Sequence, residues 1–197
     1  MFLLMDVAEE FIIICWAIFL IYFLASAFFT KRAIERRGWR VRVLFAAILA
    51  CGFVLIRYAI VSEAAFSVGV GGLMWPRSFI LNLIADTVTL IGLMVVLWAR
   101  TVLGGNWSVN PEFKEKHELI TRGPYHYVRH PIYSGILLML LGFIIAYGRV
   151  LALLIFAIFF VGILVRSRQE EKLLAKHFPK EYPEYKARVK ALIPFVL

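Results

Sequence analysis

Two apolar runs near the middle of the chain, IYSGILLMLLGFIIAY (132–147) and VLALLIFAIFFVGILV (150–165), are separated only by Gly148 and Arg149. As a helix, each run would rise about 24 Å, slightly less than the roughly 30 Å hydrocarbon core of a bilayer. Backbone amides in lipid need partners within their own segment, which favours helices over strands. The two runs therefore predict a tight helical hairpin that crosses most of a membrane.

Three longer apolar runs precede the hairpin, at about Phe11–Phe29, Val43–Val61 and Phe79–Trp98. The chain has 197 residues and is 62% hydrophobic, whereas a soluble domain is nearer half apolar. The predicted fold class is all-α, an integral membrane protein with about five transmembrane helices. Residues 1–98 would hold the first three helices. Residues 99–197 would hold a cytosolic connector, the hairpin (132–165) and a cytosolic C-terminal helix and tail.

The basic residues predict the orientation of this bundle. The formal charge is +9, and 19 of the 22 lysine and arginine residues fall in three segments, 31–42, 100–129 and 166–190. A five-helix topology puts all three segments on one side, which the positive-inside rule assigns to the cytosol. The N-terminus would then lie outside. Attraction to anionic membrane lipid explains the positive charge, so we expect no nucleic acid partner.

Two charged residues fall within predicted spans. Arg57 is near the outer end of the second span, and Asp86 is at a similar depth in the third. Charges at such depth are costly unless they are paired, so we expect an ion pair between these helices. The alternative is that Arg57 extends outward to the interface.

Cys15 and Cys51 lie in apolar runs and are expected to pack as small hydrophobic residues.

The polar stretch HELITRGPYHYVRHPIYSG (117–135) leads directly into the hairpin. Pro131 suits the first turn of a helix, where a missing N–H costs nothing. The free amides of that turn could accept an anion such as a carboxylate. Alternatively, the tyrosines and histidines form a belt at the depth of the lipid headgroups.

Two further stretches follow the hairpin. In RSRQEEKLL (166–174), Arg166 and Glu170 are four residues apart and share a helix face at the point where the apolar run ends. They could serve a site or form an ordinary surface pair. The second stretch, FPKEYPEYKARVKALIP (178–194), is typical of an amphipathic interfacial helix. Its Tyr182 and Tyr185 could equally pack or bind.

In this order and spacing, the three stretches resemble the isoprenylcysteine carboxyl methyltransferase family. The matching motifs are HxLIT (117–121), GPY (123–125), RHPxYxG (129–135), an arginine at 166 ahead of EE (170–171), and FxxEYxxYxxRV (178–189) with a terminal IPF (193–195). An upstream LGxxWS (103–108) is also similar. The resemblance covers roughly residues 99–197.

The resemblance implies a membrane methyltransferase that uses S-adenosyl-L-methionine, outside the Rossmann-type fold. Its acceptor would be a lipophilic small molecule or lipidated peptide that enters from the bilayer, with an isoprenylcysteine-like carboxylate. Arg166 would hold the substrate and act with Glu170 as a catalytic residue. No metal is implied. The implied cofactor site consists of His117, Glu118, Leu119, Ile120, Tyr125, His130, Pro131, Ile132, Tyr133 and Glu170.

Three other functions are compatible with a chain of this kind. An NADPH-dependent membrane sterol-type reductase would share a similar C-terminal architecture, although the acidic pair 170–171 fits a methyltransferase better. A phospholipid-type N-methyltransferase would need a base for its amine, and no strong candidate is present. A small transporter or scaffold would place polar residues along the bundle, whereas here they gather at one predicted surface.

Overall fold

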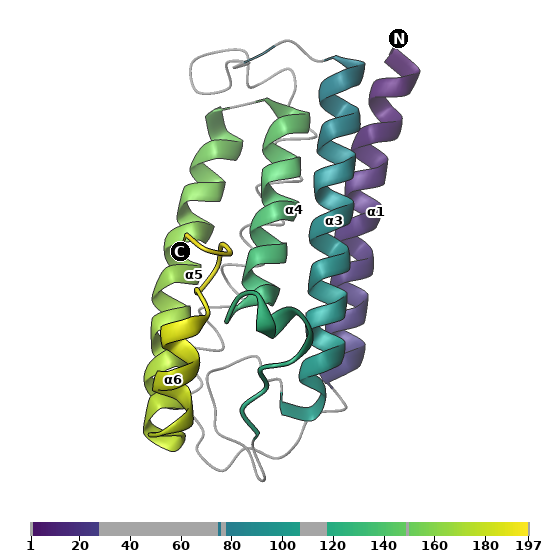
Figure 1. The fold of residues 1–197 in the computed structure, drawn as a ribbon. Coiled ribbons are helices and arrows are strands. Elements are labelled where there is room, and N and C mark those ends of the chain that lie inside the picture. Colours follow the sequence, from purple (N-terminus) through teal and green to yellow (C-terminus); the bar gives the residue numbers. More distant parts are fainter. Residues whose placement is uncertain (1, 28–74, 76–77, 107–117, 149, 197) are drawn as a thin grey trace, which may run out of the picture.

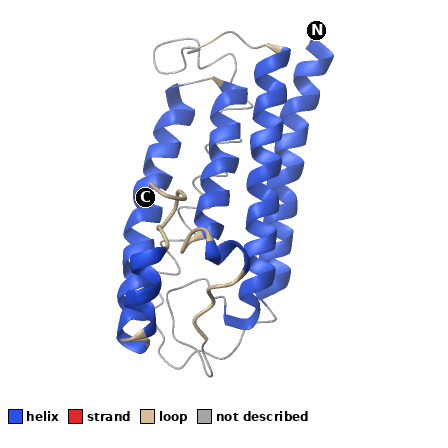
Figure 2. Cartoon of the chain, in the orientation of Figure 1, coloured by secondary structure: helices blue, strands red, loops and turns tan. Residues whose placement is uncertain are grey.

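The computed structural model describes residues 2–27, 75, 78–106, 118–148 and 150–196. These residues form helices joined by loops, without a named strand (Figure 2), so the predicted all-α class is confirmed for this part of the chain. Two short 3-10 turns, Gly104–Asn106 and Gly123–His126, lie between the helices. The α-helices are α1 (Phe2–Ala27), α3 (Phe79–Leu103), α4 (Pro131–Tyr147), α5 (Val150–His177) and α6 (Glu181–Arg188).

Four helices lie side by side in the order α1, α3, α4, α5, and the short α6 lies beside the polar end of α5 (Figure 1). Among the described residues, two helices are long and apolar enough to cross a membrane, Phe79–Leu103 and Ala152–His177. The apolar stretches of α1 and α4 are shorter. The predicted second span, 43–61, lies outside the described residues.

The predicted hairpin is present as α4 and α5. Helix α4 begins at Pro131, which lies in its first turn as the sequence predicts. His130 is the N-cap residue, and Gly148 is the C-cap residue that follows Tyr147. Gly148 has a φ of 56°, a left-handed conformation that glycine adopts without steric cost. The indole of Trp75 donates to the carbonyl oxygen of Ile145 at 3.0 Å and closes this end of the helix. Helix α5 then continues without a break through the acidic pair 170–171 to His177.

Glycines bring the backbones of α3 and α4 unusually close together. A Cβ atom added to Gly92 would lie 2.7 Å from the carbonyl oxygen of Gly135, and one added to Gly142 would lie 2.1 Å from Oγ1 of Thr89. Helices in lipid gain little hydrophobic energy from association and depend on such close packing. This interface fixes the start of α4 relative to the end of α3.

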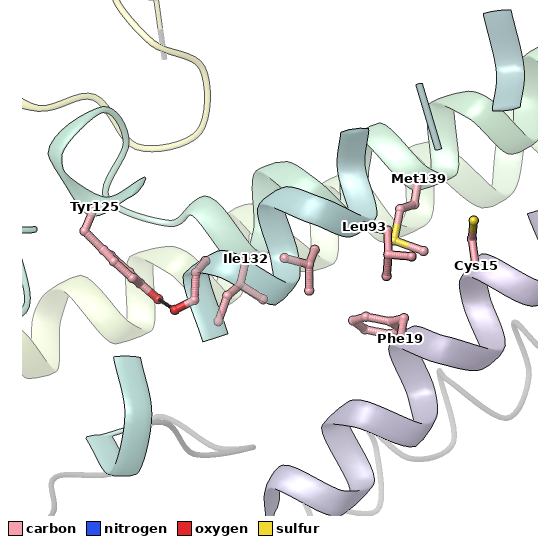
Figure 3. Close-up of a cluster of buried hydrophobic side chains, with 8 residues drawn as sticks. Cys15, Phe19, Leu93, Tyr125, Ile132 and Met139 are labelled. Carbon is pink, nitrogen blue, oxygen red and sulfur yellow. Dashed lines mark hydrogen bonds between the residues drawn. The ribbon is translucent and has the colours of Figure 1, made fainter. Parts of the chain in front are cut away.

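A buried apolar cluster connects α1 with α3 and α4 (Figure 3). Cys15 is 2% exposed within it, so its prediction as a small hydrophobic residue is confirmed; Cys51 lies outside the described residues. The hydroxyl of Tyr125 donates to the carbonyl oxygen of Ala99 at 3.3 Å and ties the connector to α3. The labelled members of the cluster are Cys15, Phe19, Leu93, Tyr125, Ile132 and Met139.

Asp86 is half-buried in the first third of α3. Among the described residues, its Oδ1 atom has no hydrogen-bond partner. Arg57 lies outside those residues, so the ion pair between the two side chains stays a prediction.

Candidate active site

Three predicted site residues meet where the first turn of α4 faces the polar half of α5. Nε of Arg166 donates to the hydroxyl of Tyr133 at 2.6 Å, and this hydroxyl donates to Oε1 of Glu170 at 2.5 Å. Nε of Arg166 is also 3.4 Å from Oε1 of Glu170, so these residues, four positions apart, pair along the helix. The Arg166 and Glu170 side chains are 12% and 25% exposed. We call these three residues and His130 the site cluster. On α5 the cluster begins at Arg166, directly after the apolar run that ends at Val165.

His130, the fourth member of the site cluster, lies between two carboxylates. Its Nδ1 is 3.5 Å from Oε2 of Glu170, and its Nε2 is 3.4 Å from Oε1 of Glu171. The ring stacks on Tyr133 with centroids 5.6 Å apart. Burial by itself would lower the pKa of His130, but hydrogen bonds and charge attraction from the two glutamates raise it above the usual value. The two carboxylates therefore favour the protonated form of the imidazole.

The same contacts keep the carboxylates ionised. Burial favours the neutral form of Glu170, but the hydrogen bond and charge of His130, with the charge of Arg166, lower its pKa. Burial likewise opposes ionisation of Glu171, whose pKa is nevertheless far below normal because His130, Lys186 and Arg129 all contact it. The site thus presents permanent negative charge beside Arg166.

Glu171 belongs to a second ion-pair network that sequence analysis did not predict. Nε and one terminal nitrogen of Arg129 lie 3.0 and 2.6 Å from Oε1 of Glu171, and Nζ of Lys186 is 2.7 Å from its Oε2. The Arg129 and Glu171 side chains are only 9% and 11% exposed. The signal in the sequence was weak: an arginine directly before His130 and a lysine within α6, each of opposite charge to the acidic pair.

The segment after α6 is tied to the start of α4 by backbone contacts. The amides of Arg129 and His130 donate to the carbonyl oxygens of Lys190 and Ala191 at 2.8 and 2.9 Å. Oγ of Ser134 donates to the carbonyl oxygen of Leu192 at 2.6 Å. The C-terminal segment 189–192 therefore holds the backbone that carries His130 in place. Sequence analysis missed this contact.

The two tyrosines of α6 pack instead of standing open to solvent. Tyr182 is 1% exposed and Tyr185 is 5% exposed. The hydroxyl of Tyr185 donates to the carbonyl oxygen of Tyr125 at 2.5 Å. Of the two alternatives left open by the sequence, the structure supports packing for this pair.

The other residues of the implied cofactor site occupy different surroundings. Pro131 and Ile132 are buried at the start of α4, and Ile120 packs against the apolar cluster of Figure 3. Leu119 is half-buried, whereas Glu118 is exposed and takes no part in the contacts of the site cluster. His117 lies outside the described residues.

A family model described as phospholipid methyltransferase matches residues 80–181, just over half of the chain. The matched span includes all four residues of the site cluster. The chain belongs to this family. The protein is thus a membrane methyltransferase, and the predicted resemblance to isoprenylcysteine carboxyl methyltransferases is confirmed by curated relatives of that name.

Three relatives of this methyltransferase illustrate the likeness. A probable protein-S-isoprenylcysteine O-methyltransferase of Oryza sativa subsp. indica is 26% identical over 184 residues, which cover 89% of this chain and 88% of the relative. Protein-S-isoprenylcysteine O-methyltransferase B of Arabidopsis thaliana is 29% identical over 142 residues, 69% of this chain and 68% of the relative. The Saccharomyces cerevisiae protein-S-isoprenylcysteine O-methyltransferase is 32% identical over 133 residues, 61% and 54% of the respective chains.

Proposed function

We propose that this methyltransferase transfers a methyl group from S-adenosyl-L-methionine to the carboxylate of an isoprenylcysteine-like or other lipophilic acceptor. The family and the names of the relatives indicate a lipid or lipidated substrate. The observation that supports a carboxylate acceptor is the position of Arg166, at the end of the apolar part of α5 and bonded to Tyr133. A guanidinium there can grip a carboxylate that arrives through the bilayer.

We further propose a five-helix topology with the N-terminus outside and the site cytosolic. The end of α3, the start of α4 and the polar end of α5 lie at one end of the bundle (Figure 1). The described parts of two basic segments, 100–129 and 166–190, lie in or next to these helix ends, and the third segment, 31–42, lies outside the described residues but follows α1 in the sequence. This distribution of basic residues supports a cytosolic assignment. Residues 1–98 would anchor the protein, and residues 99–197 would form the catalytic region.

The residues present fit the methyl donor in one important respect. S-adenosyl-L-methionine supplies an electrophilic methyl group on a sulfonium and also carries a cationic amino group. Glu170, held ionised by His130 and Arg166, offers a carboxylate for that positive charge. The proposed cofactor site comprises His117, Glu118, Leu119, Ile120, Tyr125, His130, Pro131, Ile132, Tyr133 and Glu170.

For this reaction the protein has mainly to bind the reactants and to align them. The acceptor carboxylate is ionised at neutral pH, so no proton needs to be removed. The bound donor would supply the methyl group to the carboxylate oxygen, and its sulfonium would become a neutral thioether. Arg166 would orient the carboxylate, and the low polarity at the edge of the membrane would favour its desolvation. Tyr133 and Glu170 would fix the direction of the guanidinium.

Methylation of a phospholipid amine is the second candidate, because the matching family model carries that description. An amine must lose a proton in this reaction, so a base is needed. In and next to the site cluster, the raised pKa of His130 favours its protonated form, and the lowered pKa values of Glu170 and Glu171 make their carboxylates weak bases. These pKa directions favour the carboxylate acceptor.

The test uses the full chain reconstituted in lipid nanodiscs with donor labelled in the methyl group. An S-farnesyl cysteine analogue should gain label that alkali releases as methanol, the behaviour of a methyl ester. Alkali-stable label in phosphatidylethanolamine instead would overturn the carboxylate assignment.

Isothermal titration with S-adenosylhomocysteine and with NADPH separates a methyltransferase site from a reductase site. We expect heat of binding only from S-adenosylhomocysteine.

A further inference from the structure

Residues 188–190 and Phe195 line one side of a surface hollow of about 580 Å³. Its lining includes His126, Tyr127, Arg188, Lys190 and Phe195, and none of the described residues that line it is acidic. The Nε atom of Arg188 donates to the carbonyl oxygen of Glu184 at 3.4 Å. This partner is neutral, so within the described part of the chain the contact does not offset the charge of the guanidinium. The hollow is therefore electropositive and suited to an anion.

Apolar side chains in and next to this lining are exposed. Phe195 is 93% exposed, Val196 is 72% exposed and Ile193 is 49% exposed. Phe195 also has a φ of 66°, a left-handed conformation that bulky side chains rarely adopt. Exposed apolar groups beside exposed cations, in a protein of the membrane, match the boundary between acyl chains and headgroups.

We propose that this hollow binds the phosphate of an anionic membrane phospholipid, with Arg188 and Lys190 toward the phosphate and Phe195 against the acyl chains. The charge complementarity of the lining and its continuity with the apolar tail favour a lipid over a soluble anion. This lipid is a ligand distinct from the methyl acceptor, because the hollow is lined by none of the four residues of the site cluster.

The lipid site is connected to the active site through the backbone. The carbonyl oxygens of Val189 and Lys190 accept hydrogen bonds from the side chain and the amide of Arg129, respectively. Arg129 in turn precedes His130 and contacts Glu171. A phospholipid that immobilises residues 188–190 would therefore stabilise the backbone that carries His130, so anionic lipid should also raise the thermal stability of the protein.

The experiment measures binding of short-chain phosphatidylglycerol to the full protein in a neutral detergent, by native mass spectrometry. The double variant Arg188→Gln/Lys190→Gln should bind at least about tenfold more weakly than the wild type, because each basic residue near an anionic lipid contributes about a factor of five. The control Lys172→Gln/Lys180→Gln removes the same charge from other exposed positions and should bind normally. The exchange variant Arg188→Lys/Lys190→Arg keeps both charges and should also retain binding.

Three results would overturn the proposal. The first is equal binding by the wild type and the Arg188→Gln/Lys190→Gln variant. The second is equal loss in the Lys172→Gln/Lys180→Gln control, which would indicate general attraction to a basic protein. The third is displacement of the lipid by inorganic phosphate at the same concentration, which would assign the hollow to a soluble anion. The measurement needs no methyl transfer, so its failure leaves the proposed reaction untouched.

Discussion

Nε of Arg166 lies 2.6 Å from the hydroxyl oxygen of Tyr133, which comes 33 positions earlier in the chain. This contact joins the polar half of α5 to the first turn of α4. Because the same hydroxyl donates to Glu170, the tyrosine fixes the guanidinium and the carboxylate relative to each other. The hairpin thus determines where a substrate carboxylate can be held.

The variant Tyr133→Phe tests the positioning role of this hydroxyl. Phenylalanine keeps the ring that stacks on His130 but loses both hydrogen bonds. We expect kcat to fall about tenfold, since a hydrogen bond to a charged group contributes on the order of 1.5–3 kcal/mol. The thermal midpoint should fall as well, because the same hydrogen bonds stabilise the fold. A fall in stability with normal turnover of the folded fraction would instead assign Tyr133 a structural role only.

Glu171 and its exposed partner Lys186 offer a matched pair of variants. Glu171→Gln leaves Arg129 buried without a charge partner and should destabilise the protein by about 3 kcal/mol. Lys186→Gln removes the partner whose side chain is 52% exposed, and should cost less than about 1 kcal/mol. Chemical denaturation in detergent gives both values. Equal effects from the two variants would mean that the buried network contributes no more than a surface pair.

Glycine positions test the packing of α3 on α4. A methyl group on Gly92 would meet backbone atoms of Gly135 and Met139 at 2.7 and 2.8 Å, so Gly92→Ala should cost about 1–3 kcal/mol. Gly162 in α5 has open space around its would-be Cβ, and Gly162→Ala should be neutral or stabilising by about 0.5–1 kcal/mol. Thermal unfolding in one detergent compares the two. A neutral Gly92→Ala would refute the close approach of these helices.

The protonation of His130 predicts a pH dependence. Its folded-state pKa is raised above the usual value of about 6.5, so its stabilising contribution is complete below pH 6.5 and is lost as pH rises through the folded pKa. The thermal midpoint of the wild type should therefore fall as pH rises above neutrality. His130→Gln should be less stable and should lack this fall. An identical pH profile in the variant would exclude His130 as its source.

The apolar runs predicted the hairpin well because a helix in lipid requires a continuous hydrophobic sequence. Gly148, between the two runs, marks the point where α4 ends. Helix α1 begins at Phe2, before the predicted span at about Phe11, because acidic residues interrupt an apolar run without ending a helix. Helix α3 similarly extends beyond Trp98. Its Arg100 is buried, with its guanidinium donating to Ser26 and to the carbonyl oxygen of Gly104.

The contacts within the site were only partly predictable. Arg166 and Glu170 share a helix, so their four-residue spacing was sufficient to predict that they pair. Arg129 and Glu171 are 42 positions apart and Lys186 follows 15 positions later, so their meeting depends on how α4, α5 and α6 pack. The pairing of the C-terminal segment with the start of α4 is of the same kind. Local sequence patterns carry no information about such long-range contacts.

The role of Arg166 can be measured by titrating S-adenosylhomocysteine into the Arg166→Ala variant and assaying its methyl transfer. If Arg166 holds the acceptor carboxylate, activity should fall at least about a hundredfold, while affinity for S-adenosylhomocysteine stays within about threefold of the wild type. Arg166→Lys, which keeps the charge without the planar fork, should recover only part of the activity. Equal loss of cofactor binding and of activity in Arg166→Ala would contradict the assignment of Arg166 to the substrate.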